Sequence, residues 1–201
     1  MRAWDNFTTN QTTSGHIVRF LPRDFKIFRE LEPGWEYPEI WNHVENKIAT
    51  WLETRRAVGL SSDMSDPDVA DYIKDWRIPY DPTKFPNKWW VLEPDKPVRT
   101  VLAHLGKDSY SHIHFDAAQA RTISLREAAR LQSFPDGYRF EGSMNQALRQ
   151  IGNAVPPLLA YALAVGIRES LGVTVADDMR VKYLEIEPKT VCVVEGLPTD
   201  K

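Results

Sequence analysis

The chain has 201 residues, of which 42% are apolar and seven are tryptophan, a composition typical of a packed globule. A net charge of −3 excludes a globally basic protein, so any nucleic-acid contact has to come from a local patch. The single cysteine, Cys192, excludes a disulfide framework and a thiolate metal cluster. No signal-peptide core is visible, and the longest apolar run, 154–167, is too short to span a bilayer. We therefore expect a cytoplasmic protein without membrane contact.

Three helices are predicted before residue 79. Apolar residues recur at helical spacing at Phe25, Phe28 and Leu31, at Ile40, Val44, Ile48 and Leu52, and at Val69, Tyr72, Ile73 and Trp76. The first helix should stop at Pro33–Gly34 and the third before Pro79, while Ser65–Asp68 supplies a cap for the third.

The following segment is rich in prolines and aromatic residues. Trp89–Leu92 and Val98–Leu105 have the composition of short strands, and Glu93–Pro97 that of the turn between them. After residue 121, Ser124 with Glu127 and Ser143 with Gln146 are capping boxes that predict two helices. The first of these should begin at Leu125 and end before Pro135.

The stretch 149–167, RQIGNAVPPLLAYALAVGI, predicts a corner followed by a third helix. Gly152 is placed to end the preceding helix, and the new helix starts at Pro156–Pro157 and ends near Gly172. It is apolar nearly all round, which is typical of a helix buried on more than one face. Gly152 and Asn153 could present free amide groups to a ligand, or form an ordinary turn with an asparagine cap.

Residues 121–157 resemble the last two sequence motifs of the DNA cytosine-5 methyltransferases. The penultimate motif is matched in RTISLREAARLQSFP, at Arg121, Ser124, Arg126, Glu127, Ala129, Arg130, Gln132, Phe134 and Pro135. The last is matched by QIGNAVPP at 150–157. Looser similarity to the target-recognition region of that family covers 99–116, with the Thr100–Val101 pair, and 14–34.

This resemblance implies the C-terminal portion of an α/β methyltransferase that uses S-adenosylmethionine. Its fold would be a small mixed α+β target-recognition region, 1–120, then helical motifs, 121–172, that pack onto a Rossmann-like catalytic domain absent from this sequence. The tail, 173–201, alternates like two short strands. Gly152, Asn153 and Ala154 would contact the cofactor, and the apolar helix 157–171 would dock on the catalytic sheet.

The penultimate motif is expected to be a scaffold, with Arg121, Ser124, Arg126, Glu127, Arg130 and Gln132 as its structural residues. Arg126 and Arg130 lie one helical turn apart and repel each other unless an anion lies between them. Glu127 is a candidate partner of Arg130. We favour an internal ion-pair network over phosphate contact for this group.

No catalytic residue is assigned. The family nucleophile is a thiolate in a Pro-Cys dipeptide that adds to a flipped cytosine, whereas Cys192 follows a valine after the last motif. The family's Gly-rich cofactor loop is also absent. We therefore expect a partial enzyme, inactive alone, whose S-adenosylmethionine binding needs a catalytic half in trans. The alternative is a non-catalytic DNA-binding module, which would have to cover helix 157–171 itself or self-associate through it.

Double-stranded DNA is the expected partner. The candidate contacts are scattered polar and basic residues: Arg19, Lys84, Lys88, Arg99, Thr100, His104 and Lys107. His112 and His114 share one side of a strand, but two histidines without a third ligand do not make a metal site, so no metal is assigned.

Overall fold

The structure is a computed structural model that describes residues 15–103, 105–106 and 110–172. Its described residues form two compact units. Unit 1 is drawn from Met1–Val18, Glu93–Lys107 and Ile123–Lys201, and unit 2 from Arg19–Leu92 and Asp108–Thr122. The expected tail strands of 173–201 lie outside the described residues.

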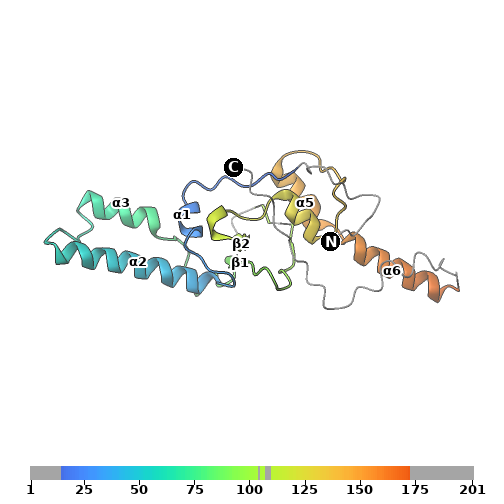
Figure 1. Cartoon of the computed structure of the whole chain (residues 1–201), viewed down its shortest axis with the longest axis horizontal. Helices are drawn as coiled ribbons and strands as arrows, with labels where there is room; N and C mark the ends of the chain where they lie inside the picture. The colour runs from blue at the N-terminus through green and yellow to red at the C-terminus, as the bar shows by residue number, and fades with distance from the viewer. Residues whose placement is uncertain (1–14, 104, 107–109, 173–201) are drawn as a thin grey trace. The chain divides into compact units, whose positions relative to one another are not determined.

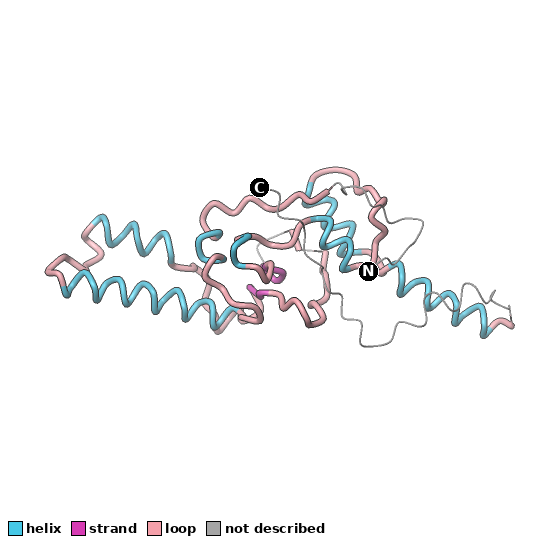
Figure 2. Tube along the Cα trace, viewed as in Figure 1, coloured by secondary structure: helices cyan, strands magenta, loops and turns pink. Residues whose placement is uncertain are grey.

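Unit 2 begins with three helices, as predicted: α1 (Phe25–Phe28), α2 (Tyr37–Ala57) and α3 (Pro67–Trp76). In α2 the Glu36 and Glu39 side chains form a reciprocal capping box. In α3, Asp66 accepts the Asp68 amide at 3.0 Å, and Pro67 occupies the first turn, where no intrahelical acceptor is lost. Helices α2 and α3 lie side by side as a helical hairpin (Figures 1 and 2).

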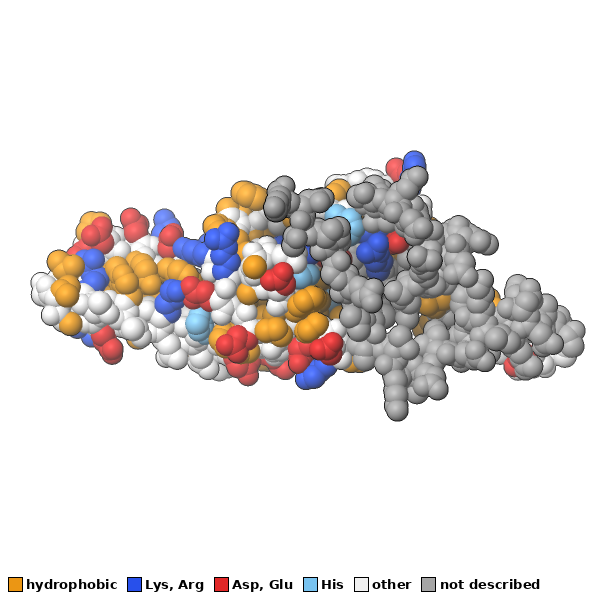
Figure 3. Space-filling view, in the orientation of Figure 1, with side chains coloured by type: hydrophobic (Ala, Val, Ile, Leu, Met, Phe, Trp, Pro, Cys, Tyr) orange, Lys and Arg blue, Asp and Glu red, His pale blue; other side chains and the backbone are white. Residues whose placement is uncertain are grey.

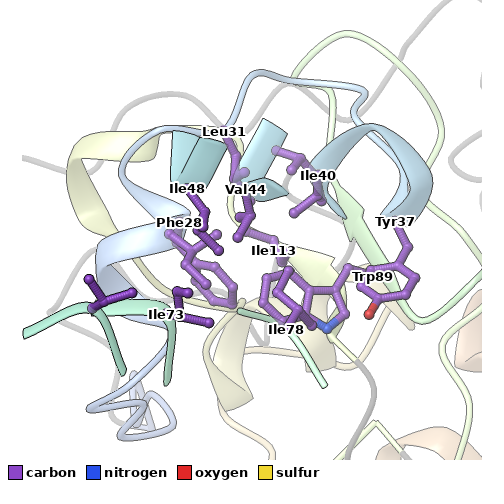
Figure 4. Packing of buried hydrophobic residues seen from close by; sticks show 13 residues of the cluster. Phe28, Leu31, Tyr37, Ile40, Val44, Ile48, Ile73, Ile78, Trp89 and Ile113 are labelled. Atoms are coloured by element: carbon purple, nitrogen blue, oxygen red, sulfur yellow. The ribbon is translucent and has the colours of Figure 1, made fainter. Parts of the chain in front are cut away.

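The core of unit 2 is built around the fully buried side chain of Trp89 (Figure 4). The ring centroids of Phe28 and Tyr110 lie 5.4 Å and 5.0 Å from that of Trp89, in edge-to-face arrangements that aromatic pairs prefer. Ile40, Val44 and Ile48 of α2 pack against this centre, as the one-face spacing in the sequence predicted.

A two-stranded parallel sheet lies beside this core. Strand β1 (Trp89–Val91) confirms the first predicted strand, and it pairs with β2 (Tyr110–Ile113) in the register Trp89 to Tyr110. A short 3-10 helix, η1 (Ala117–Gln119), follows β2. The described chain is therefore a mixed α and β structure with a small sheet.

The second strand predicted, Val98–Leu105, is wrong. Its described residues are irregular, and the Leu105 amide donates to the Leu102 carbonyl at 3.0 Å to close a turn. Val101 is buried and Thr100 exposed, so the alternation is real. The described residues of the segment do not pair in a sheet, and the Leu102 backbone lies against Gly152.

Unit 1 contains the three predicted C-terminal helices: α4 (Leu125–Leu131), α5 (Met144–Asn153) and α6 (Pro157–Ser170). Both predicted capping boxes are present, Ser124 with Glu127 and Ser143 with Gln146. The expectation that Gly152 ends its helix is wrong, because α5 continues through Asn153.

By length and composition alone, Met144–Ser170 is apolar enough to cross a membrane. The segment is nevertheless two helices, interrupted where Ala154 adopts an extended conformation before Pro156. The longer helix, α6, has 14 residues and measures about 21 Å, less than the roughly 30 Å of a bilayer core. This break argues against a membrane span.

The packing of α2 can be tested with one chemical change at two positions. Val44 is 1% exposed and Val58, at the end of the same helix, is 67% exposed. Val44→Ala should lower the free energy of unfolding by about 2 kcal/mol, since two buried carbons are lost and a cavity is left. Val58→Ala should change it by less than about 0.5 kcal/mol. Urea unfolding of both variants is the measurement, and equal losses would refute this packing.

Candidate functional site

The start of α4 is fixed by a buried reciprocal cap. The Ser124 hydroxyl accepts the Glu127 amide at 3.2 Å, and the Glu127 carboxylate accepts the Ser124 amide at 2.6 Å. Both residues are buried, so these bonds lie in a low-dielectric setting where leaving an amide unpaired is costly. The backbone of Gly15 and Ile17 adds to this anchor, accepting the amides of Arg126 and Leu125 at 3.0 Å each.

Arg126 is a buried arginine that holds the loop after α4. Its guanidinium donates to the carbonyl oxygens of Tyr138 at 3.1 Å and Pro135 at 3.5 Å. Burial lowers the pKa of Arg126, and the neighbouring charge of Asp136 opposes that shift. These two bonds attach the buried guanidinium to the backbone of the loop at Pro135 and Tyr138.

Arg130 pairs with Asp136 through two parallel bonds. Its Nε lies 2.8 Å and its second terminal nitrogen 3.0 Å from the two carboxylate oxygens. The hydrogen bond with Arg130 holds the pKa of Asp136 below its usual range. The carboxylate that forms the parallel bonds with Arg130 is therefore that of Asp136, and the charge of Glu127 also acts to raise the pKa of Arg130. The sequence analysis missed Asp136, although the Pro135–Gly137 turn is a typical setting for such a residue.

Ser133 ends α4 and caps α6. Its amide donates to Arg130, and the next amide, of Phe134, donates to Ala129, each at 2.9 Å, which is the Schellman pattern of a helix end. Ser133 has a φ of +59°, a conformation that glycine usually fills. Its hydroxyl accepts the Leu158 amide at 3.1 Å. Neither Pro156 nor Pro157 has an amide hydrogen or a capping side chain, so Ser133 supplies the cap that α6 lacks.

Gln132, the preceding residue, binds the other helix end. Its side-chain amide donates to the Ile151 carbonyl at 3.2 Å, in the last turn of α5. The same carbonyl also accepts the Ala154 amide at 3.2 Å, so the side chain of Gln132 is its second donor. Gln132 and Ser133 together, which we call the corner clamp, thus attach the penultimate motif to the end of α5 and the start of α6. Sequence reasoning identified Gln132 as structural but missed Ser133.

Gly152 is a packing residue in this geometry. A Cβ at this position would overlap the Leu102 carbonyl group and lie 2.5 Å from the Ala103 amide nitrogen. The expectation of free amides at Gly152 and Asn153 is wrong, because both residues lie within α5, whose amides bond one turn back. Asn153 is exposed and Ala154 half-buried, so the Asn153 side chain remains available to a ligand.

Helix α6 exposes much of its apolar surface. Leu159, Leu163 and Ile167, spaced four residues apart, are 51%, 56% and 60% exposed, and among its described side chains Val165 alone is buried. In unit 1, α6 extends away from α4 and α5 (Figure 1). The sequence predicted a helix buried on more than one face, but among the described residues nothing covers the face that carries Leu159, Leu163 and Ile167.

The candidate DNA contacts fall in both units. Arg19, Lys84 and Lys88 belong to unit 2, and Arg99 and Thr100 to unit 1. His104 and Lys107 lie outside the described residues. Arg121 also belongs to unit 2, where its Nε donates to the Gln119 side chain at 2.8 Å.

His112 and His114 are buried. The Nδ1 of His112 lies 2.9 Å from the Ser111 hydroxyl, and that of His114 accepts the Asp116 amide at 3.1 Å. Within the described part of the chain, no three His, Cys, Asp or Glu side chains group closely enough to hold a metal ion.

Comparison with known proteins identifies the family. Residues 6–169 match the C-5 cytosine-specific DNA methylase family. A protein of Oceanobacillus iheyensis named "Putative type II methyltransferase M.OihORF3336P" is 42% identical over 161 residues, covering 79% of this chain and 33% of that protein. The type II methyltransferase M.AgeI of Thalassovita gelatinovora is 49% identical over 87 residues, 43% of this chain and 20% of its own. No solved structure matches the chain significantly.

These similarities define the family of the chain. The chain belongs to the C-5 cytosine-specific family, as the motifs at 121–157 indicated. Plant relatives share the resemblance, and DNA (cytosine-5)-methyltransferase 3 of Arabidopsis thaliana is 53% identical over 57 residues, 28% of this chain and 4% of its own. The chain spans about a third of the length of the Oceanobacillus relative and less of the others.

Two helical glycines test the packing of the corner. Gly152→Ala should lower the free energy of unfolding of unit 1 by about 1–3 kcal/mol, because the added methyl overlaps the Leu102 backbone. Gly166→Ala, in α6, has nothing within 4 Å of the new methyl and should instead stabilise by up to about 1 kcal/mol. Thermal unfolding of both variants is the measurement. Stabilisation by Gly152→Ala would mean that Gly152 does not pack against Leu102.

Proposed function

We propose that this chain is the C-terminal part of a DNA cytosine-5 methyltransferase, in which unit 2 contributes target recognition and unit 1 closes the S-adenosylmethionine pocket. Family membership and coverage of about a third of the Oceanobacillus relative support this assignment. The 201 residues contain no Pro-Cys dipeptide, since the one cysteine follows Val191. The chain alone is therefore expected to transfer no methyl group. DNA modification also fits the cytoplasmic localisation expected from the sequence.

The residues near the corner fit a cofactor in part. Asn153 is exposed and offers a side-chain amide, and Ala154 follows in an extended conformation with little side chain to obstruct a ligand. Gly152 contributes by allowing the close approach of Leu102, which fixes the turn that carries Asn153. The cofactor, when bound, supplies the methyl group, and the chain's own contribution is to position Asn153 and Ala154 at the edge of its pocket.

The observation that carries the proposal is the uncovered apolar face of α6. Burying a leucine or isoleucine side chain is worth about 1.5–3 kcal/mol relative to leaving it exposed, so three half-exposed ones favour association. A catalytic sheet with a complementary apolar face would cover Leu159, Leu163 and Ile167. The capped, interrupted geometry of 151–158 supports a fixed docking element instead of a flexible tail.

A non-catalytic DNA-binding module is the second candidate. Such a protein would have to cover the apolar face of α6 with its own residues, or it would have to self-associate so that helix 157–171 packs against a second copy. Leu163 and Ile167 are exposed among the described residues, which favours self-association as its route. The two functions differ in whether a catalytic segment binds α6.

Reconstitution tests the choice directly. The chain alone should incorporate no tritium from labelled S-adenosylmethionine into duplex DNA. Mixing it with the part of the Oceanobacillus relative that it does not match should restore incorporation and protect 155–170 from hydrogen exchange. Leu163→Ser should reduce that incorporation at least tenfold, with little change in the melting temperature of the chain alone, because Leu163 is exposed there.

Ala164→Ser is the matched control, because it adds the same hydroxyl to an exposed position beside Leu163 on α6. Methyl transfer by the chain alone would refute the partial-enzyme assignment. A monomer already fully protected across 155–170 would favour the self-sufficient binding module.

A further inference from the structure

One part of unit 2 combines basic and exposed aromatic side chains from two distant segments. We call it the basic aromatic surface and define it as Arg19, Phe20, Arg23, Lys84, Phe85 and Lys88. Phe20 is 86% and Phe85 51% exposed. Residues 19–29 hold four basic side chains against a single acid, Asp24.

Tyr110 of β2 holds the two segments together. Its hydroxyl donates to the Asp24 carboxylate at 2.7 Å, and its amide donates to the Lys88 carbonyl at 2.9 Å. Asp24 is buried and also accepts Arg23 Nε at 2.6 Å, which directs this guanidinium from the same anchor. The ammonium of Lys88 lies 3.4 Å from the centroid of the Tyr80 ring and 5.6 Å from that of Phe85. These contacts fix the Arg23–Asp24 pair and the Lys88 backbone to the same residue, Tyr110.

The α2–α3 hairpin in the same unit has the opposite charge. Residues 63–76, which include α3, carry five aspartates and one lysine, Lys74. Asp68 and Asp71 are exposed there and line a hollow of about 530 Å³ beside the stacked rings of Trp51 and Tyr72. A phosphate backbone is repelled by this flank and attracted by the basic aromatic surface. In Figure 3, basic side chains gather beside α1.

We propose that the basic aromatic surface is the face of unit 2 that contacts the phosphate backbone of duplex DNA, and that the α2–α3 hairpin points away from the DNA. This inference rests on the proposed function, which it sharpens by assigning the phosphate contacts to a defined surface. The proposal adds Arg23 to the three DNA-contact candidates of unit 2 that the sequence indicated. It assigns phosphate contacts to the basic side chains of 19–24 and 84–88 and none to those of the hairpin. Aromatic rings beside the cations limit their hydration, which favours ion pairing with phosphate.

The salt dependence of DNA binding tests the assignment. The full chain is titrated into a fluorescent duplex at several salt concentrations, and the slope of log affinity against log salt is measured. Arg19→Gln and Lys84→Gln should each reduce the slope by about one, since each removes one phosphate contact. Arg56→Gln and Lys74→Gln remove the same charge from the hairpin, and these matched controls should leave the slope unchanged. Arg23 is not substituted because its loss would remove the guanidinium that pairs with the buried Asp24 carboxylate.

The possible outcomes distinguish failure of the assigned surface from failure of the proposed DNA-recognition function. Equal effects of the surface and hairpin variants would overturn the orientation. DNA binding by the parent that none of the surface variants weakens would also overturn it, while leaving target recognition intact. Failure of the parent to bind any duplex at low salt would instead remove the recognition role of the chain, and the surface with it. Melting temperatures of all four variants within about 2 °C of the parent's show that the changes are in binding and not in folding.

Discussion

The geometry of unit 1 depends on the hydroxyl of Ser133. The Schellman end of α4 calls for a left-handed residue, which glycine fills without strain, and a side chain there costs about 1–3 kcal/mol. Serine is present, and its hydroxyl accepts the first amide that α6 presents. A helix cap is worth about 1 kcal/mol, so it offsets part of this cost. In return, the hydrogen bond from Leu158 to Ser133 fixes the position at which α6 begins.

The two residues of the corner clamp act with the contact between Gly152 and Leu102. Gln132 binds the last turn of α5, Ser133 binds the first turn of α6, and the absence of a Cβ at Gly152 lets the Leu102 backbone approach α5. Three independent contacts therefore fix a three-residue interruption between the helices. Helix α6 leaves this corner in one direction, with Leu159, Leu163 and Ile167 in a row on its exposed side. The proposed docking of a catalytic domain follows from that presentation.

Local patterns predicted the helices well, because the decisive signals are short-range. Each capping box, at Ser124 and at Ser143, is defined by residues three positions apart, and the apolar face of α2 by residues four apart. The partner of β1 was not predictable in this way. Val101 alternates with exposed neighbours as a strand residue would, but its burial comes from packing within unit 1, a long-range fact that periodicity does not contain.

For the candidate site, too, the sequence indicated the local residues but not their long-range partners. The motif residues Ser124, Arg126 and Gln132 were recognisable as a group, whereas their acceptors, the Tyr138 and Ile151 carbonyls, are backbone atoms that no motif specifies. Gly152 was expected to end a helix, whereas it lies within α5 and its lack of a Cβ allows the close approach of Leu102. Asp136 and Ser133 were missed because each is defined by a partner across a turn.

The central claim is that the penultimate motif holds the corner from which α6 is presented. Site-resolved hydrogen exchange at the Leu158 amide tests it most directly, because the residues before Leu158 are prolines and its amide bonds to Ser133. In Ser133→Ala the Leu158 amide should exchange at least tenfold faster. The Ala160 amide, which bonds to the Pro156 carbonyl at 2.9 Å within the same helix, should change far less. Unchanged exchange at Leu158 would contradict the clamp and leave α6 an independently formed helix.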